Sequence, residues 1–202
     1  MFPNALNLDN LINMKTIPNL FVLFFLLFLL SCEQGPLIEN YKIDGISIGD
    51  SLLDYLPEKE IINQVNNPRA SYDHLNPTKK YSEIYISEGL KTYSAVSVFV
   101  ENGDKKYIIH GMFGELENNS IEKCLEKKTK TIQEFDILFK EESTVSKEDY
   151  AIPQGFMYEY NYFLNTSDRA TIQCVEAPEY RQHNMLMISL TSHDLGSWLF
   201  VE

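Results

Sequence analysis

The chain is short of positive charge. It has 17 Lys and Arg against 29 Asp and Glu, which gives a net charge of -12 over 202 residues. Binding to nucleic acids depends largely on cations that neutralise phosphates, so this balance excludes DNA and RNA as expected partners. Nothing repeats internally, and a length of 202 residues with 44% apolar content suits one ordered domain with an appendage.

The chain also lacks an apolar run long enough to cross a bilayer. The run from Leu20 to Leu30 has eleven residues. As a helix it would cover roughly 16 Å, about half of a bilayer core. Lys15 precedes the run and Ser31 follows it, an arrangement typical of a secretory signal peptide. No cation precedes Met14, so we expect translation to begin at that residue.

The apolar run ends in a motif of four residues, Leu29-Leu30-Ser31-Cys32. This motif resembles the lipobox of bacterial lipoproteins. The resemblance implies cleavage before Cys32, a diacylglycerol on its thiol and a further acyl chain on its new amino group. Two or three acyl chains hold a protein stably on a membrane, at about 0.8 kcal/mol per buried CH₂. The alternative is a plain cleaved signal with an incidental cysteine.

The same resemblance divides the chain into a signal peptide over 1–31, a lipidated tether over 32–40 and one periplasmic domain over 41–202. The mature chain keeps the net charge of -12, because the signal carries one cation and one acid. Glu33 replaces the aspartate that retains lipoproteins at the inner membrane of enteric bacteria, which favours the outer membrane. The membrane, reached through the acyl chains, is therefore an expected partner.

The periodicity of the domain predicts an α+β fold. We expect an antiparallel β-sheet of about five to six strands, with one long helix and two short helices packed on one face. Seven segments are candidates for these strands: 41–48, 81–87, 90–100, 106–112, 156–164, 169–175 and 185–191. The expected helices follow Ser51, Ser120 and Ser192, and 66–80 and 141–155 are expected to be polar loops. Asn102-Gly103-Asp104 is a strong hairpin signal.

Cys124 and Cys174 are the cysteines of the mature domain besides Cys32. Both fall on apolar faces, and disulfides persist outside the inner membrane. A bond between them would close a loop of 51 residues (124 to 174 inclusive). By the chain-entropy relation such a bond stabilises a domain by about 4 kcal/mol. We predict the disulfide, with two buried free thiols as the alternative.

Gly49-Asp50-Ser51-Leu52 stands between a predicted strand and a predicted helix. It resembles the nucleophile block of the GDSL lipase and esterase family, which implies that Ser51 attacks an ester carbonyl. The Asp-x-x-His that supplies the base in that family is not found at any of the four histidines. A structural role explains the same residues, because Gly can end a strand and Ser can cap a helix.

Three other patterns have a structural and a functional interpretation. The spacings of His74, His110, His183 and His193 fit no metal site, and no cofactor is expected. Tyr158, Tyr160 and Tyr162 predict a strand that packs on a helix, or a surface that stacks on a sugar or aromatic ligand. Lys123, Lys127, Lys128 and Lys130 predict a solvated helix face, or a contact with an acidic partner.

Taken whole, residues 41–200 resemble a group of bacterial envelope proteins of unknown function: a strand ending in Ile-Gly-Asp-Ser-Leu, a central hairpin, a lysine-rich helix with Cys124 and a strand with Cys174. The resemblance implies no activity. We therefore expect a non-enzymatic module that binds an envelope protein or small ligand. A serine esterase acting through Ser51 and a purely structural lipoprotein are the alternatives.

Overall fold

A computed structural model describes residues 38–66, 79–153, 155–176 and 184–199, which belong to one compact unit over 35–202. The predicted signal peptide, the lipobox with Cys32, and the histidines His74 and His183 lie outside the described residues. So does most of the loop predicted at 66–80.

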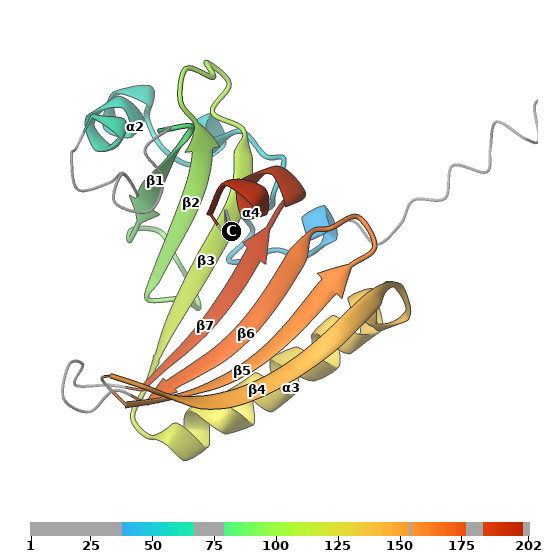
Figure 1. The fold of residues 1–202 in the computed structure, drawn as a ribbon. Coiled ribbons are helices and arrows are strands. Elements are labelled where there is room, and N and C mark those ends of the chain that lie inside the picture. Colours follow the sequence, from blue (N-terminus) through green and yellow to red (C-terminus); the bar gives the residue numbers. More distant parts are fainter. Residues whose placement is uncertain (1–37, 67–78, 154, 177–183, 200–202) are drawn as a thin grey trace, which may run out of the picture. The chain divides into compact units, whose positions relative to one another are not determined.

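The centre of the fold is one antiparallel sheet of seven strands, in the order β1-β2-β3-β7-β6-β5-β4 (Figure 1). The strands are β1 (Tyr81–Ile86), β2 (Ala95–Glu101), β3 (Ile109–Asn118), β4 (Ser143–Ile152), β5 (Gly155–Leu164), β6 (Arg169–Glu176) and β7 (Asn184–Thr191). The α-helices of the described residues are α2 (Glu58–Val65), α3 (Ile121–Phe139) and α4 (His193–Leu199), and the 3₁₀ turns are η1 (Ile38–Asn40), η2 (Leu52–Asp54) and η3 (Lys140–Glu142).

Two meanders of strands meet at the pair β3 and β7. Their register runs from Gly111 opposite Thr191 to Asn118 opposite Asn184. β3 lies inside the sheet and β4 lies at its far edge, so the chain between them must cross the strands that separate the two. α3 makes this crossing and contacts β3, β7, β6 and β5. Ser120 caps its first turn by accepting a hydrogen bond from the amide of Lys123.

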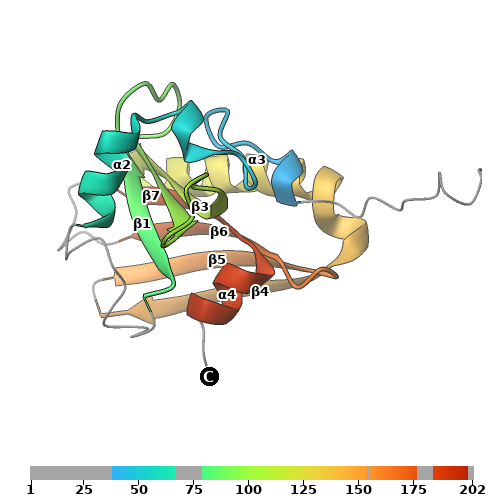
Figure 2. The same cartoon turned by 90° about the horizontal axis from the view of Figure 1, so that it is seen from above.

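The main core lies between the sheet and α3. Its members include Ile172 and Tyr162 from the strands and Phe135 and Phe139 from the helix. The segment 38–56 packs against the same side of the sheet (Figure 2). Gly114 of β3 provides the room for it, because a Cβ there would lie 2.8 Å from atoms of both Ile43 and Tyr93.

α4 packs against the opposite side of the sheet (Figure 2). A Cβ on Gly111 would lie 2.3 Å from Leu195 of α4, so this glycine permits the close approach of helix to strand. A small second core forms there from Tyr81, Phe99, Leu195 and Trp198. α4 contacts β3. The rest of this side of the sheet, which faces away from α3 and is formed by β7, β6, β5 and β4, is here called the open face.

The predicted α+β class and the antiparallel sheet are confirmed, but the strand count of five to six is wrong. The additional strand is β4, which replaces most of the loop predicted at 141–155. It was missed because its sequence, STVSKEDYAI, is polar on both faces, a pattern common in edge strands that must not pair with other chains.

Two further expectations are corrected. The predicted strand at 41–48 is a set of turns with one isolated bridge between Ile43 and Ile46, because it finds no partner strand in the sheet. The helices do not share one face, because α4 lies opposite α3. Within the described ranges, no helix has both the length and the apolar content needed to span a membrane.

Candidate functional site

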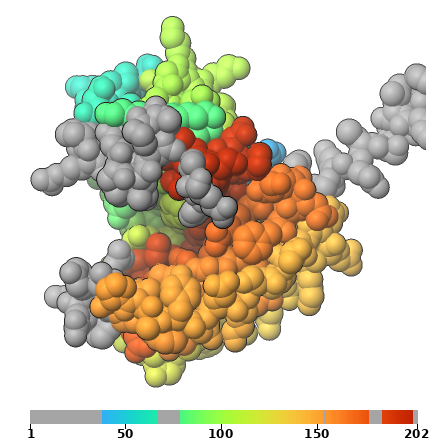
Figure 3. Space-filling model, viewed as in Figure 1, coloured from blue at the N-terminus to red at the C-terminus, as the bar shows by residue number. Residues whose placement is uncertain are grey.

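The open face contains a polar hollow with a volume of about 310 Å³. Pairing of β6 with its two neighbours builds the floor: Thr171 lies opposite Ser189 of β7 and Asn161 of β5, and Gln173 lies opposite Met187 and Glu159. Alternation along a strand places these side chains on the side away from α3. Figure 3 shows the hollowed surface between α4 and the strands β5 and β4. Its lining is Phe113, Tyr150, Glu159, Arg169, Thr171, Gln173, Met187, Ser189 and Thr191.

The carboxylate of Glu159 is the centre of the hydrogen bonds in this floor, and only 6% of this residue is exposed. It accepts hydrogen bonds from the side-chain amides of Asn161 and Gln173, each at 2.5 Å. The Tyr150 hydroxyl donates at 3.1 Å and Nη2 of Arg169 at 3.3 Å. Burial by itself would raise the pKa of Glu159, but these four donors outweigh it and hold the pKa below its ordinary value.

Asn161 joins the second half of this network. Its side-chain oxygen accepts from the Arg169 guanidinium at 2.7 Å and from the Thr171 hydroxyl at 2.8 Å. Asn161 and Thr171 are 1% and 5% exposed, so an unmade hydrogen bond there would cost the full desolvation of a polar group. Packed and mutually bonded, these side chains form a rigid polar floor rather than a flexible surface.

Three groups of the hollow keep hydrogen-bonding capacity toward a ligand. The amide nitrogen of Gln173 is held by Glu159, which fixes the plane of the amide, and within the described residues its oxygen has no donor. The hydroxyls of Ser189 and Thr191 make only a long contact with each other, at 3.4 Å. Phe113 and Met187 add an apolar wall beside them. The arrangement suits binding through directed hydrogen bonds with some apolar contact.

Ser51 lies at the start of η2 and acts as its N-cap. Its hydroxyl donates to the carbonyl of Lys106 at 2.7 Å and accepts from the amide of Leu53 at 3.3 Å. No hydrogen bond joins Ser51 to a histidine among the described residues. The capping interpretation of the Gly-Asp-Ser-Leu motif is confirmed. The hydroxyl of Ser51 already uses its proton and one lone pair in hydrogen bonds that stabilise the fold.

Cys124 and Cys174 are bonded, as predicted. Their sulfur atoms lie 2.07 Å apart and their Cα atoms 5.9 Å apart. Both residues are fully buried, so the bond joins α3 to β6 inside the main core. It is a structural staple, and the hollow of the open face lies on the other side of β6.

The tyrosine stripe faces α3, as the packing interpretation predicts. Tyr162 is fully buried, and its hydroxyl lies 2.9 Å from a carboxylate oxygen of Asp136 and 3.1 Å from the carbonyl of Ile132. Tyr158 and Tyr160, on the same strand, line a groove beside α3. Among the described residues, no cluster of His, Cys, Asp and Glu is arranged to hold a metal ion.

The lysine run of α3 does not form one solvated face. Lys130 pairs with Glu126 at 2.7 Å and both side chains are well exposed, but Lys128 is only 4% exposed. The buried stripe of α3 consists of Cys124, Lys128, Thr131, Phe135 and Phe139. Residue 128 follows Cys124 at the i+4 spacing of one helix face, so this spacing was the signal that could have identified the lysine as buried.

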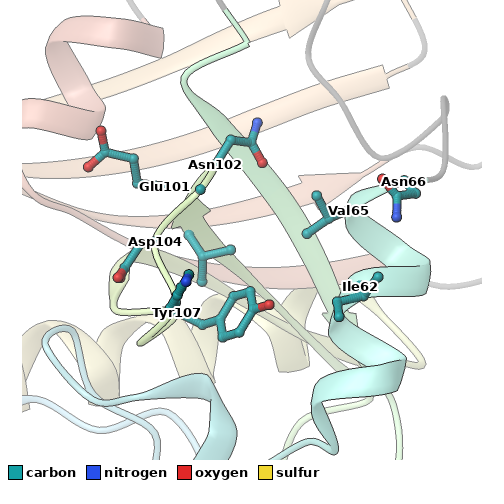
Figure 4. Close-up of a pocket in the computed structure, with 10 residues that line it drawn as sticks. Ile62, Val65, Asn66, Glu101, Asn102, Asp104 and Tyr107 are labelled. Atoms are coloured by element: carbon teal, nitrogen blue, oxygen red, sulfur yellow. The ribbon is translucent and has the colours of Figure 1, made fainter.

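A second hollow, of about 320 Å³, lies between α2 and the hairpin of β2 and β3 (Figure 4). Ile62, Val65 and Tyr107 form its apolar walls. Two of its polar side chains hold the turn: the Asp104 carboxylate accepts from the amides of Lys106 and Ile108, each at 2.9 Å. Asn102 donates to the carbonyl of Lys79 at 2.6 Å. Asn66, Glu101 and Lys105 complete its polar lining.

Comparisons with known proteins found no match of this chain to a protein family, to a curated protein or to a solved structure.

Proposed function

We propose that the chain is a lipid-anchored periplasmic lipoprotein whose domain binds an envelope protein or small ligand on the open face, without catalysis. The lipobox motif at 29–32 supports the anchor. A disulfide in the core suits an oxidising compartment. Between the inner and the outer membrane, Glu33 after the lipidated cysteine favours the outer membrane.

One observation carries the binding role: a rigid polar floor lies at the base of a hollow and leaves the Gln173 oxygen and two hydroxyls available. A sheet face that served only as a solvated surface would not need a buried carboxylate held by four donors. Such preorganisation lowers the entropy that a ligand must overcome on binding.

Site-specific photocrosslinking in cells tests the proposal. Met187, which lines the hollow, is replaced with p-benzoylphenylalanine in the anchored chain. The matched control carries the same probe at Ile137, which is 84% exposed on α3. We expect an adduct from position 187 that position 137 does not give.

A second pair of variants ties any adduct to the hollow. Gln173→Leu and Thr191→Val remove hydrogen-bonding groups while keeping side-chain size, so they should abolish the adduct from position 187. An adduct that is unchanged in these variants, or that forms equally from both probe positions, contradicts binding on the open face.

A further inference from the structure

The groove beside α3 contains a lysine amine that has no hydrogen-bond or ion-pair partner among the described residues. It has a volume of about 390 Å³ and is lined by Leu125, Lys128, Thr129, Ile132, Lys147, Asp149, Tyr158 and Tyr160. The first four come from α3 and the others from β4 and β5. The groove therefore lies at the far edge of the sheet, on the face opposite to the polar hollow.

Lys128 is the unusual member of this lining. It is 4% exposed, and among the described residues its amine makes no hydrogen bond and no ion pair. Its Nζ is not among the unpartnered side-chain atoms that are sealed from solvent. The end of the side chain therefore reaches solvent at the groove. A buried charge without a partner is costly, and proteins rarely keep one unless another group compensates it.

The charges around the amine favour an anion. Asp149 is the acid of the groove, and its carboxylate lies 3.9 Å from the amine of Lys147. The lining itself therefore carries two lysines and one aspartate, and Glu159, on the other side of the sheet, adds a weaker attraction on the Lys128 amine. Burial lowers the pKa of Lys128, the repulsion of Lys147 adds to this, and the attraction of Asp149 and Glu159 offsets it only in part.

We propose that this groove is a second binding site, which takes a small ligand with a carboxylate or phosphate group against Lys128 and an apolar or aromatic body against its walls. Leu125, Ile132 and the rings of Tyr158 and Tyr160 supply those walls. Lys147 is mostly exposed, so its side chain can turn from Asp149 to the ligand. An anion on Lys128 restores the electrostatic stabilisation that the amine loses on burial.

Titration of the full chain in detergent, with ¹⁵N-labelled lysine, tests the site by NMR. The probes are benzoate and phenyl phosphate. Acetate and inorganic phosphate are controls that carry the anionic group without an aromatic ring, and benzyl alcohol is a control that carries the ring without a charge. We expect saturable shifts with benzoate or phenyl phosphate, weaker binding of the ring-free anions and none of the alcohol. The stronger of the two aromatic anions identifies whether the site prefers a carboxylate or a phosphate.

Two variants assign the shifts to the buried amine. Lys128→Met keeps an apolar side chain of similar length and should weaken binding at least about tenfold, as expected for the loss of a charge-assisted hydrogen bond. Lys130→Met removes an exposed lysine two residues away and should leave binding unchanged. Equal binding by Lys128→Met and the unaltered chain, or no saturable shift with any anion, overturns the proposal.

Misfolding is excluded by recording the backbone NMR spectrum of each variant. If Lys128→Met keeps the native spectrum and loses binding, the site is supported. If it loses the native spectrum, Lys128→Arg decides, since it keeps the charge: retained anion binding supports the site and lost binding with a native spectrum contradicts it.

Discussion

Lys128 lies one turn of α3 beyond Cys124, on the same buried stripe of the helix. Cys124 is bonded to Cys174 of β6, so the turn that precedes the lysine is covalently held to the sheet. The staple therefore helps to hold the side chain of Lys128, which is 4% exposed, against the sheet, in addition to stabilising the fold.

Replacing Lys128 with Met should raise the free energy of unfolding at neutral pH by about 1–3 kcal/mol, because an apolar group then occupies a desolvated place. The pKa of Lys128 is lowered in the folded state, so its cost is present at neutral pH and is relieved as the pH rises toward the ordinary value of 10.5. The advantage of the variant should shrink over that range in chemical denaturation. Lys130→Met, on the exposed side, should change stability by no more than about 0.5 kcal/mol.

Removing the disulfide should lower stability by about 4 kcal/mol, because the bond restricts an unfolded loop with a separation of 50 residues. The variant is Cys124→Ala with Cys174→Ala, measured by urea unfolding. Reductant should destabilise the unaltered chain and leave the double variant unchanged. Equal unfolding midpoints for the unaltered chain and the double variant, both without reductant, would contradict the stabilising role.

Ser51→Ala should lower the free energy of unfolding by about 1 kcal/mol, because it removes the cap of η2 and the bond to the Lys106 carbonyl. Ser51→Asn should restore much of this loss, since Asn also caps helices well. Neither change should alter hydrolysis of nitrophenyl esters. Ester hydrolysis by the unaltered chain that both variants abolish would instead indicate a nucleophilic Ser51.

Glu159 should make the free energy of unfolding depend on pH in the acid range. Its folded-state pKa lies below the ordinary 4.5, so its contribution is complete above that value and is lost as the pH falls through the folded-state pKa. Glu159→Gln should cost about 3 kcal/mol at pH 7, because it breaks the buried pair with Arg169. It should also flatten the acid part of the stability profile. Glu148→Gln, an exposed position opposite Glu159 on β4, is the matched control and should do neither.

Cys32→Ala should abolish incorporation of radiolabelled palmitate and release the protein from the membrane fraction. The acyl chains supply the binding energy, whereas a domain with a net charge of -12 is repelled by anionic lipid. Cys124→Ala with Cys174→Ala serves as the control and should still be labelled. Label retained by the Cys32 variant would rule out the lipobox.

The elements that the sequence predicted well are those whose signals are local. Gly103 adopts the positive φ that the hairpin needs, and Ser120 begins α3 where its periodicity begins. Alternation was enough to identify β5, β6 and β7. The sequence of β4 does not alternate although the segment is a strand, whereas 41–48 alternates although it forms turns. The local pattern therefore gave the wrong prediction for both segments.

The sequence by itself determined the acidic charge, the lipobox motif, the α+β class and the cysteine pair, because composition, short motifs and periodicity are properties of neighbouring residues. Tertiary structure alone decided the two candidate sites. Glu159 meets Gln173 and Arg169 only through the register of β5 with β6. Lys128 becomes buried only because α3 crosses toward an edge strand that the sequence did not reveal. Such contacts join residues distant in the chain, and pairing rather than local pattern places them.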